Sequence, residues 1–236
     1  NTPLQVDVEF LHMATHKSKN TSQNHLNKFY HTIDDVRHKK YDGMIITGAP
    51  VENIEFEMVD YWQELKDVMD YAETNVTSTI YICWGAQAGL YYHYGIKKHS
   101  LKSKLFGVFP HKKLVNDPLL KGSDDVFYIP HSRHTKINDA DLLNCKDLEV
   151  LASSKQAGCA IIKSKDSKKF FFTGHSEYDR DTLKQEYFRD VDKGLKIAPP
   201  ENYFTDSSFT SVDMKWVSMA NLIYTNWLNY YVYQVT

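Results

Sequence analysis

Hydrophobic and polar positions follow two different periods in the first half of the chain. Residues 5–11 alternate in polarity and predict a strand, while 42–47 and 79–82 are short apolar runs that predict buried strands. Apolar side chains spaced three and four apart predict one helix over 23–39 and another over 56–74. This alternation of strands and helices favours a parallel, doubly wound sheet.

The second half has a different pattern, in which short apolar runs are separated by turns. Runs of this kind are typical of hairpins. These strands are expected at 105–109, 126–129, 148–151, 158–162 and 169–173. Two helices are expected after them, over 181–193 and 212–231. We therefore predict a single α/β domain over residues 1–236, with a doubly wound, mostly parallel, flavodoxin-like sheet and additional short antiparallel strands.

Composition and charge argue against several classes of function. Hydrophobic residues make up 42% of the 236 residues, which suits a globular core. The formal net charge of −2 argues against nucleic acid as the main partner. No apolar run of about 18 residues and no signal-peptide pattern is present, so we expect no membrane role. The three cysteines, Cys83, Cys145 and Cys159, have no C-x-x-C spacing, which predicts a cytoplasmic protein.

One cysteine stands where a predicted buried strand ends. The apolar run 79–82 stops at Cys83, and small residues such as Gly85 then begin a helix. This strand–turn–helix is typical of a nucleophile elbow, here with Cys in place of Ser. The helix N-terminus stabilises a thiolate, and the backbone N–H of Trp84 is placed to bind an oxyanion. A buried structural cysteine is the alternative interpretation.

A histidine and a glutamate follow another predicted strand. His175 and Glu177 are two residues apart, so in an extended segment their side chains point to the same face. A catalytic thiolate needs a base, and a carboxylate orients that base. Cys83, His175 and Glu177 therefore form a candidate triad. A surface or structural histidine is the alternative, since the chain has 11 histidines.

Two further polar clusters have more than one interpretation. Residues 130–134 follow a strand and are interpreted as a substrate loop; a metal site with His111 is disfavoured because no carboxylate or Cys has ligand spacing. Glu186 and Arg189 share one face of a predicted helix. They form either a surface ion pair or a clamp for a zwitterion, with Arg189 on its carboxylate and Glu186 on its ammonium.

Seven motifs together resemble one family of enzymes. They are 46–52 (ITGAPVE), 82–88 (ICWGAQA), 104–109 (KLFGVF), 130–135 (PHSRHT), 173–178 (TGHSEY), 186–190 (EYFRD) and 226–234 (NWLNYYVYQ). The family is that of the MetA-type homoserine O-acyltransferases of methionine biosynthesis, which are related to class I glutamine amidotransferases. The resemblance runs from the first residues of the chain to the last.

The resemblance implies an acyl-CoA-dependent, ping-pong transfer to the hydroxyl of L-homoserine. By position in the motifs, Cys83 would form the acyl-thioester, His175 would accept the proton, and Glu177 would be its partner. Backbone N–H groups near Val51 and at Trp84 would bind the oxyanion. The family also implies acetyl-CoA as a co-substrate, no resident cofactor or metal, and a homodimer.

Four side chains correspond to substrate-binding positions in the family. Arg189 would bind the carboxylate of homoserine and Glu186 its amino group, while Lys104 and Ser132 match substrate-contacting positions. Two features depart from the family pattern. Its members carry several dozen residues before the position of Asn1, including a lysine of the active site, so we expect a short N-terminal segment to be missing here. The loop after 203–204 also lacks the usual proline.

Glu52 resembles the residue that selects the acyl donor, with Glu typical of acetyl enzymes and Gly of succinyl enzymes. A carboxylate at the acyl pocket repels the carboxylate of a succinyl group and fills its space. The alternative places Glu52 next to a helix N-terminus, where it favours the helix dipole. We therefore expect acetyl-CoA as the donor, with a homoserine O-succinyltransferase as the alternative.

Two other functional classes use the same sheet. A glutaminase-type amidotransferase has the same Cys-His-Glu triad, but its elbow has Gly two residues before the Cys, where this chain has Tyr81. A non-catalytic redox sensor would have Cys83 oxidised rather than acylated.

Overall fold

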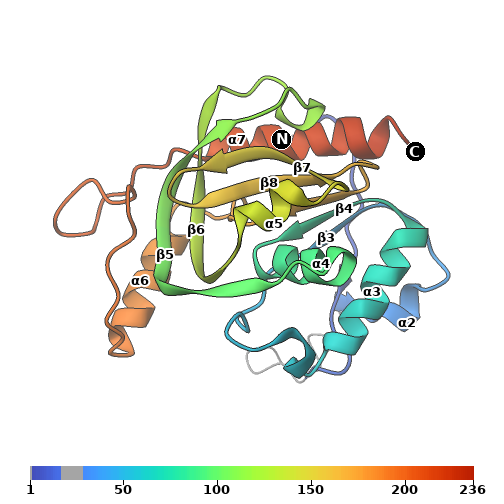
Figure 1. Ribbon diagram of the computed structural model, residues 1–236, viewed down its shortest axis with the longest axis horizontal. Helices are drawn as coiled ribbons and strands as arrows, with labels where there is room; N and C mark the ends of the chain where they lie inside the picture. Colours follow the sequence, from blue (N-terminus) through green and yellow to red (C-terminus); the bar gives the residue numbers. More distant parts are fainter. Residues whose placement is uncertain (1, 17–28) are drawn as a thin grey trace.

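The computed structural model describes residues 2–16 and 29–236, and its centre is a seven-stranded sheet (Figure 1). The strand order is β3-β4-β9-β8-β7-β5-β6. The strands are β3 (Tyr41–Ile46), β4 (Val76–Ile82), β5 (Lys98–Lys113), β6 (Val126–Ile137), β7 (Leu148–Ser154), β8 (Gly158–Ser164) and β9 (Lys169–Phe172). Strands β3, β4 and β9 pair in parallel, and the pairings from β9 to β6 are antiparallel.

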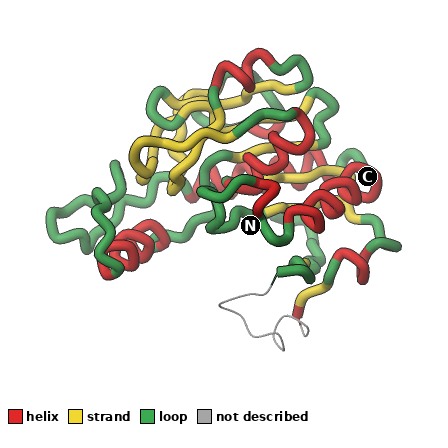
Figure 2. The backbone as a smooth tube through the Cα atoms, turned by 60° about the horizontal axis from the view of Figure 1, so that its bottom comes forward, coloured by secondary structure: helices red, strands yellow, loops and turns green. Residues whose placement is uncertain are grey.

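Helices pack on both faces of this sheet (Figures 1 and 2). They are α2 (Ile33–Val36), α3 (Trp62–Asn75), α4 (Trp84–Tyr94), α5 (Asp139–Asn144), α6 (Thr182–Asp192) and α7 (Val217–Trp227), with 3-10 helices η1 (Phe56–Met58) and η2 (Pro118–Leu120) and π-helix η3 (Leu228–Tyr233). Tyr81 and Phe171 pack with α3 and α4, while their neighbours Ile80 and Phe170 pack with α7. The predicted doubly wound α/β fold is therefore confirmed, although the antiparallel strands β5 and β6 are longer than expected.

The N-terminal predictions need correction. Within 5–11 only Phe10–Leu11 form a strand, β1, which pairs in parallel with β2 (Tyr30–His31). The prediction of a helix over 23–39 is therefore wrong at residues 30–31, which form strand β2. Residues 23–28 of the predicted helix lie outside the described residues. A new helix begins after Thr32, because Thr32 N donates to Asp35 Oδ2 at 2.7 Å in a capping box.

Two predictions in the second half also differ from the structure. The segment 130–134 is part of strand β6 rather than a loop, because residues 130–133 pair with residues 105–108 of β5. The last helix begins at Val217, not at 212, since Val212 bridges to Phe204 and the Trp216 indole donates to Tyr178 O at 2.8 Å. None of the described helices is long and apolar enough to cross a membrane.

Candidate active site

Cys83 lies in a strained turn between β4 and α4. Its φ of 52° and ψ of −114° fall in a region that L-residues rarely adopt. Close packing imposes this turn, because a Cβ at Gly85 would lie 2.7 Å from Ile46 O at the end of β3. Cys83 N also donates to Phe172 O at 2.7 Å, which ties the turn to β9. The structure has the predicted geometry of a nucleophile elbow.

His175 and Glu177 follow β9, which is the parallel neighbour of β4. The Nδ1 atom of His175 is 2.7 Å from Glu177 Oε1, and His175 N donates to Pro130 O at 2.8 Å. Burial lowers the pKa of His175, but the charge of Cys83 and hydrogen bonds with Cys83 and Glu177 outweigh it and raise the pKa to about 10. The structure therefore brings the three side chains together, with an imidazolium beside the cysteine.

The two predicted oxyanion donors are the backbone N–H groups of Trp84 and Val51. Trp84 is the first residue of α4, where a backbone N–H has no intrahelical acceptor. The loop after β3 passes beside it, since a Cβ at Gly48 would lie 3.3 Å from Cys83 Cβ and 3.6 Å from Trp84 N. Val51 follows in the same loop. Its role as an oxyanion donor stays a prediction.

A buried charge cluster connects β5 and β6 with α6. Glu186 Oε2 accepts a hydrogen bond from Ser132 Oγ at 2.5 Å, and Oε1 accepts one from Tyr178 Oη at 2.9 Å. Lys104 Nζ lies 3.5 Å from Glu186 Oε2 and 3.1 Å from Asp190 Oδ2. These five residues, Lys104, Ser132, Tyr178, Glu186 and Asp190, are called the α6 cluster below. Lys104 and Ser132 therefore meet Glu186, although the three come from different elements.

Arg189 is paired with Asp190, not with Glu186. Its Nε and Nη2 atoms donate to Asp190 Oδ1 at 3.1 and 3.0 Å, and its side chain is 56% exposed. Burial raises the pKa of Asp190, but the bonds from Lys104 and Arg189 outweigh it and lower that pKa. The surface-pair interpretation of Glu186 and Arg189 is therefore wrong. Sequence reasoning missed Asp190 and Tyr178 as members of the site, although both lie inside its motifs.

Glu52 lies in the loop between β3 and η1 and reaches across to β6. Its Oε2 atom accepts from His134 N at 2.7 Å and from Thr135 Oγ1 at 3.4 Å. Thr135 Oγ1 is also 2.8 Å from Gln87 Oε1 on α4. The helix expected after Glu52 does not begin next to it, since η1 begins at Phe56. The alternative role of Glu52 at a helix N-terminus is therefore wrong.

The histidines of 130–134 do not converge on one point. His131 is fully buried and its Nε2 atom lies 3.2 Å from Nε2 of His111, while His134 is exposed. Burial lowers the pKa of His111 to about 4 and lowers that of His131 well below its ordinary value of 6.5, so both are neutral. Over residues 2–16 and 29–236, no group of three or more His, Cys, Asp and Glu side chains is placed to hold a metal ion.

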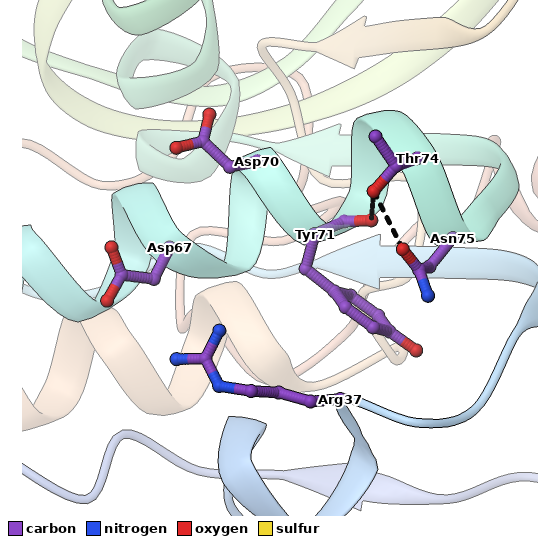
Figure 3. Close-up of a pocket in the computed structure, with 6 residues that line it drawn as sticks. All are labelled: Arg37, Asp67, Asp70, Tyr71, Thr74 and Asn75. Carbon is purple, nitrogen blue, oxygen red and sulfur yellow. Dashed lines mark hydrogen bonds between the residues drawn. The ribbon is translucent and has the colours of Figure 1, made fainter.

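A surface pocket lies between Arg37 and helix α3 (Figure 3). It is lined by Arg37, Asp67, Asp70, Tyr71, Thr74 and Asn75. Asn75 directly precedes the amino end of β4, whereas Cys83 directly follows the carboxyl end of β4. Ligands of α/β sheets bind at the carboxyl ends of the strands, so this pocket is separate from the candidate site.

The fold resembles that of glutamine amidotransferases, and it brings Cys83, His175 and Glu177 together. A glutamine amidotransferase from Thermotoga maritima superposes with a TM-score of 0.58 and 12% identity, over 87% of this chain and 89% of that chain. This likeness supports the fold alone.

Sequence comparison is more specific. The family model of homoserine O-succinyltransferase matches residues 1–236. A homoserine O-acetyltransferase of Shouchella clausii is 57% identical over 100% of this chain and 77% of its own length. One of Clostridium novyi is 56% identical over 100% of this chain and 79% of its own. The chain belongs to the homoserine O-succinyltransferase family, and the resemblance inferred from the seven motifs is confirmed.

Proposed function

We propose that this protein transfers an acetyl group from acetyl-CoA to the hydroxyl of L-homoserine, a step of methionine biosynthesis. The observation that carries the proposal is a cysteine on a strained elbow, paired with His175 and Glu177 and linked to the α6 cluster. The family and the names of the relatives support acyl transfer to homoserine. The homodimer, the lack of a resident cofactor and the cytoplasmic location stay predictions.

In the first half-reaction the Cys83 thiolate attacks the carbonyl carbon of acetyl-CoA. Backbone N–H groups of Trp84 and Val51 donate to the oxyanion that forms. The bond between the carbonyl carbon and the CoA sulfur then breaks, and that sulfur takes the proton of the His175 imidazolium. CoA leaves as a thiol, Cys83 is left as an acetyl-thioester, and His175 is left neutral.

The second half-reaction uses the neutral imidazole. The charge of Cys83 is one of the causes that raise the pKa of His175, and a thioester carries no such charge. His175 therefore remains neutral and accepts the hydroxyl proton while the homoserine oxygen attacks the thioester carbonyl. The bond to Cys83 Sγ breaks, O-acetylhomoserine leaves, and the thiolate–imidazolium pair is restored.

The α6 cluster supplies the acceptor site in this scheme. Lys104 is closer to Asp190 than to Glu186, at 3.1 against 3.5 Å, and Glu186 would bind the ammonium of homoserine. Arg189 is exposed enough to meet the carboxylate, for which a guanidinium has matching geometry. The acceptor would thus be held at both charged ends while its hydroxyl faces the thioester.

Intact-mass measurement tests the reaction. We expect acetyl-CoA alone to add one acetyl group at Cys83, and homoserine, but not water or ammonia, to discharge it. The Cys83→Ala variant should gain no acetyl group. Absence of an adduct on the wild-type protein would refute acyl transfer through Cys83, and discharge by ammonia would point to amidotransferase chemistry.

Donor choice is tested at Glu52. The Glu52→Gly variant should use succinyl-CoA better relative to acetyl-CoA, by about 10-fold or more, because a like charge next to the succinyl carboxylate is removed. Glu55→Gly, an exposed carboxylate of the same loop, is the matched control. Equal donor preference in wild-type and Glu52→Gly proteins would contradict the selector role. Preference of the wild-type protein for succinyl-CoA would make it a homoserine O-succinyltransferase.

A further inference from the structure

Tyr178 touches both halves of the candidate site. Its ring stacks on the imidazole of His175, with centroids 4.1 Å apart and an interplanar angle of 17°. Its hydroxyl donates to Glu186 Oε1 at 2.9 Å. One side chain thus contacts the base of the triad at one end and the carboxylate of the acceptor site at the other.

The position of this side chain is fixed by its own backbone. Tyr178 O accepts the indole N–H of Trp216 at 2.8 Å, and Tyr178 N donates to His175 O at 3.3 Å. Trp216 is 1% exposed and lies in a hydrophobic cluster with Val108 and Leu183. A shift of the Tyr178 ring would therefore disturb packing between the sheet and α6.

The two contacts have different chemical effects. The face of an aromatic ring attracts a cation, so stacking favours the imidazolium of His175 and holds its plane. The hydroxyl stays protonated because burial and the charge of Glu186 raise the pKa of Tyr178. As a donor it fixes Oε1 of Glu186, while Ser132 fixes Oε2. The carboxylate is therefore oriented from both sides before an acceptor arrives.

We propose that Tyr178 is a positioning residue that couples the amino-acid acceptor site to the base of the triad, through its stack on His175 and its hydrogen bond to Glu186. This inference rests on the proposed function. The hydroxyl serves binding of the acceptor ammonium, and the ring serves proton transfer in both half-reactions. The two contacts can be removed separately.

The Tyr178→Phe variant keeps the ring and removes the hydroxyl. We expect the KM for homoserine in the discharge of acetyl-Cys83 to rise by about 10-fold or more, the effect of losing a hydrogen bond to a charged group. The rate of Cys83 acylation by acetyl-CoA should stay within about twofold of wild type. Tyr92→Phe is the matched control, because Tyr92 also donates to a carboxylate, Asp70, at 2.7 Å, on the outer side of α3 and α4.

The Tyr178→Leu variant removes the ring as well. We expect both half-reactions to slow, and the imidazole of His175 to titrate at lower pH, which ¹⁵N NMR measures without any substrate. Circular dichroism and the thermal midpoint establish that each variant is folded.

The outcomes separate this inference from the proposed function. No acetyl adduct on wild-type Cys83 refutes the proposed function. If wild-type Cys83 is acetylated but the KM for homoserine is unchanged in Tyr178→Phe, the coupling through the hydroxyl is refuted. An unchanged titration of His175 in Tyr178→Leu refutes the role of the ring. Equal slowing of both half-reactions in Tyr178→Phe would assign Tyr178 a purely structural role and overturn the proposal.

Discussion

The elbow of Cys83 and the α6 cluster are connected through His175 and Tyr178, but they are held in place by different means. The elbow is fixed by the backbone: Cys83 has a φ of 52°, its N–H is bonded to β9, and Gly85 lets α4 approach the end of β3. Its geometry needs no charged side chain. The position of Cys83 is therefore set by the backbone of the sheet itself.

The α6 cluster is held by side chains. Lys104, Ser132 and Glu186 come from β5, β6 and α6, and hydrogen bonds and charges bring them together. Long side chains can rearrange when a ligand competes for their partners. The comparison teaches that this site combines a rigid centre for bond making with a more adaptable region for recognition. Substitutions in the elbow should therefore abolish function, while those in the cluster should produce graded effects.

The largest effect is expected at Cys83. The Cys83→Ala variant should lose acyl transfer by about 10³-fold or more, because the covalent intermediate cannot form. Cys83→Gly should be equally inactive but about 1 kcal/mol more stable than Cys83→Ala, since glycine adopts positive φ without strain. Steady-state kinetics and urea denaturation of the two variants test this. Equal stability would show that the elbow is not strained.

The second effect tests how rigidly the elbow is packed. Gly85→Ala would place a Cβ 2.7 Å from Ile46 O, so we expect a loss of about 1–3 kcal/mol of unfolding free energy together with most of the activity. Gly95→Ala is the control: it also strains the backbone, at φ 68°, but its Cβ would meet nothing within 4 Å. A Gly85→Ala variant as active as the control would contradict the view that packing sets the nucleophile.

A smaller, graded effect is expected in the α6 cluster. Asp190→Asn removes the charge that holds Lys104 and Arg189, so Lys104 is free to pair with Glu186 in place of the acceptor. The KM for homoserine should rise by about 10-fold, with less change in the rate of Cys83 acylation. Asp192→Asn, an exposed residue of the same helix, is the control. Loss of acylation equal to that of Cys83→Ala would show that the two regions are not separable.

The smallest effect concerns pH. The pKa of His175 is raised to about 10 in the folded protein, against an ordinary value of 6.5. Its contribution to stability is fully present below pH 6.5 and is lost as the pH rises through about 10, because only the folded state retains the proton in that range. Between pH 7 and 10 the unfolding free energy of the wild-type protein should therefore fall more steeply than that of His175→Asn. Denaturation at several pH values gives the unfolding free energy of both proteins. If this free energy depends on pH in the same way in wild type and in His175→Asn, the pairing of His175 with Cys83 is contradicted.

Much of the elbow could be predicted from the sequence, since its signals are local. An apolar run, a cysteine and small residues within 79–89 are enough to specify a buried strand, a sharp turn and a helix. His175 and Glu177 share a face because they are two residues apart. The family motifs lie in short segments for the same reason, so family and fold class were both evident without the structure.

Tertiary structure alone decided which distant residues meet. Lys104 and Asp190 are 86 positions apart, and no period in the chain relates them. Tyr178 joins His175 to Glu186 only because α6 brings Glu186 beside Ser132 of β6, and residues 130–134 are a strand only because β5 pairs with β6 there. Hydrophobic periodicity reports on neighbours within one element, whereas strand order and helix placement follow from burial across the whole molecule. The sequence by itself therefore determined the elbow of Cys83 and the His175–Glu177 pair as candidates, and the fold determined the charged cluster that lies beside them.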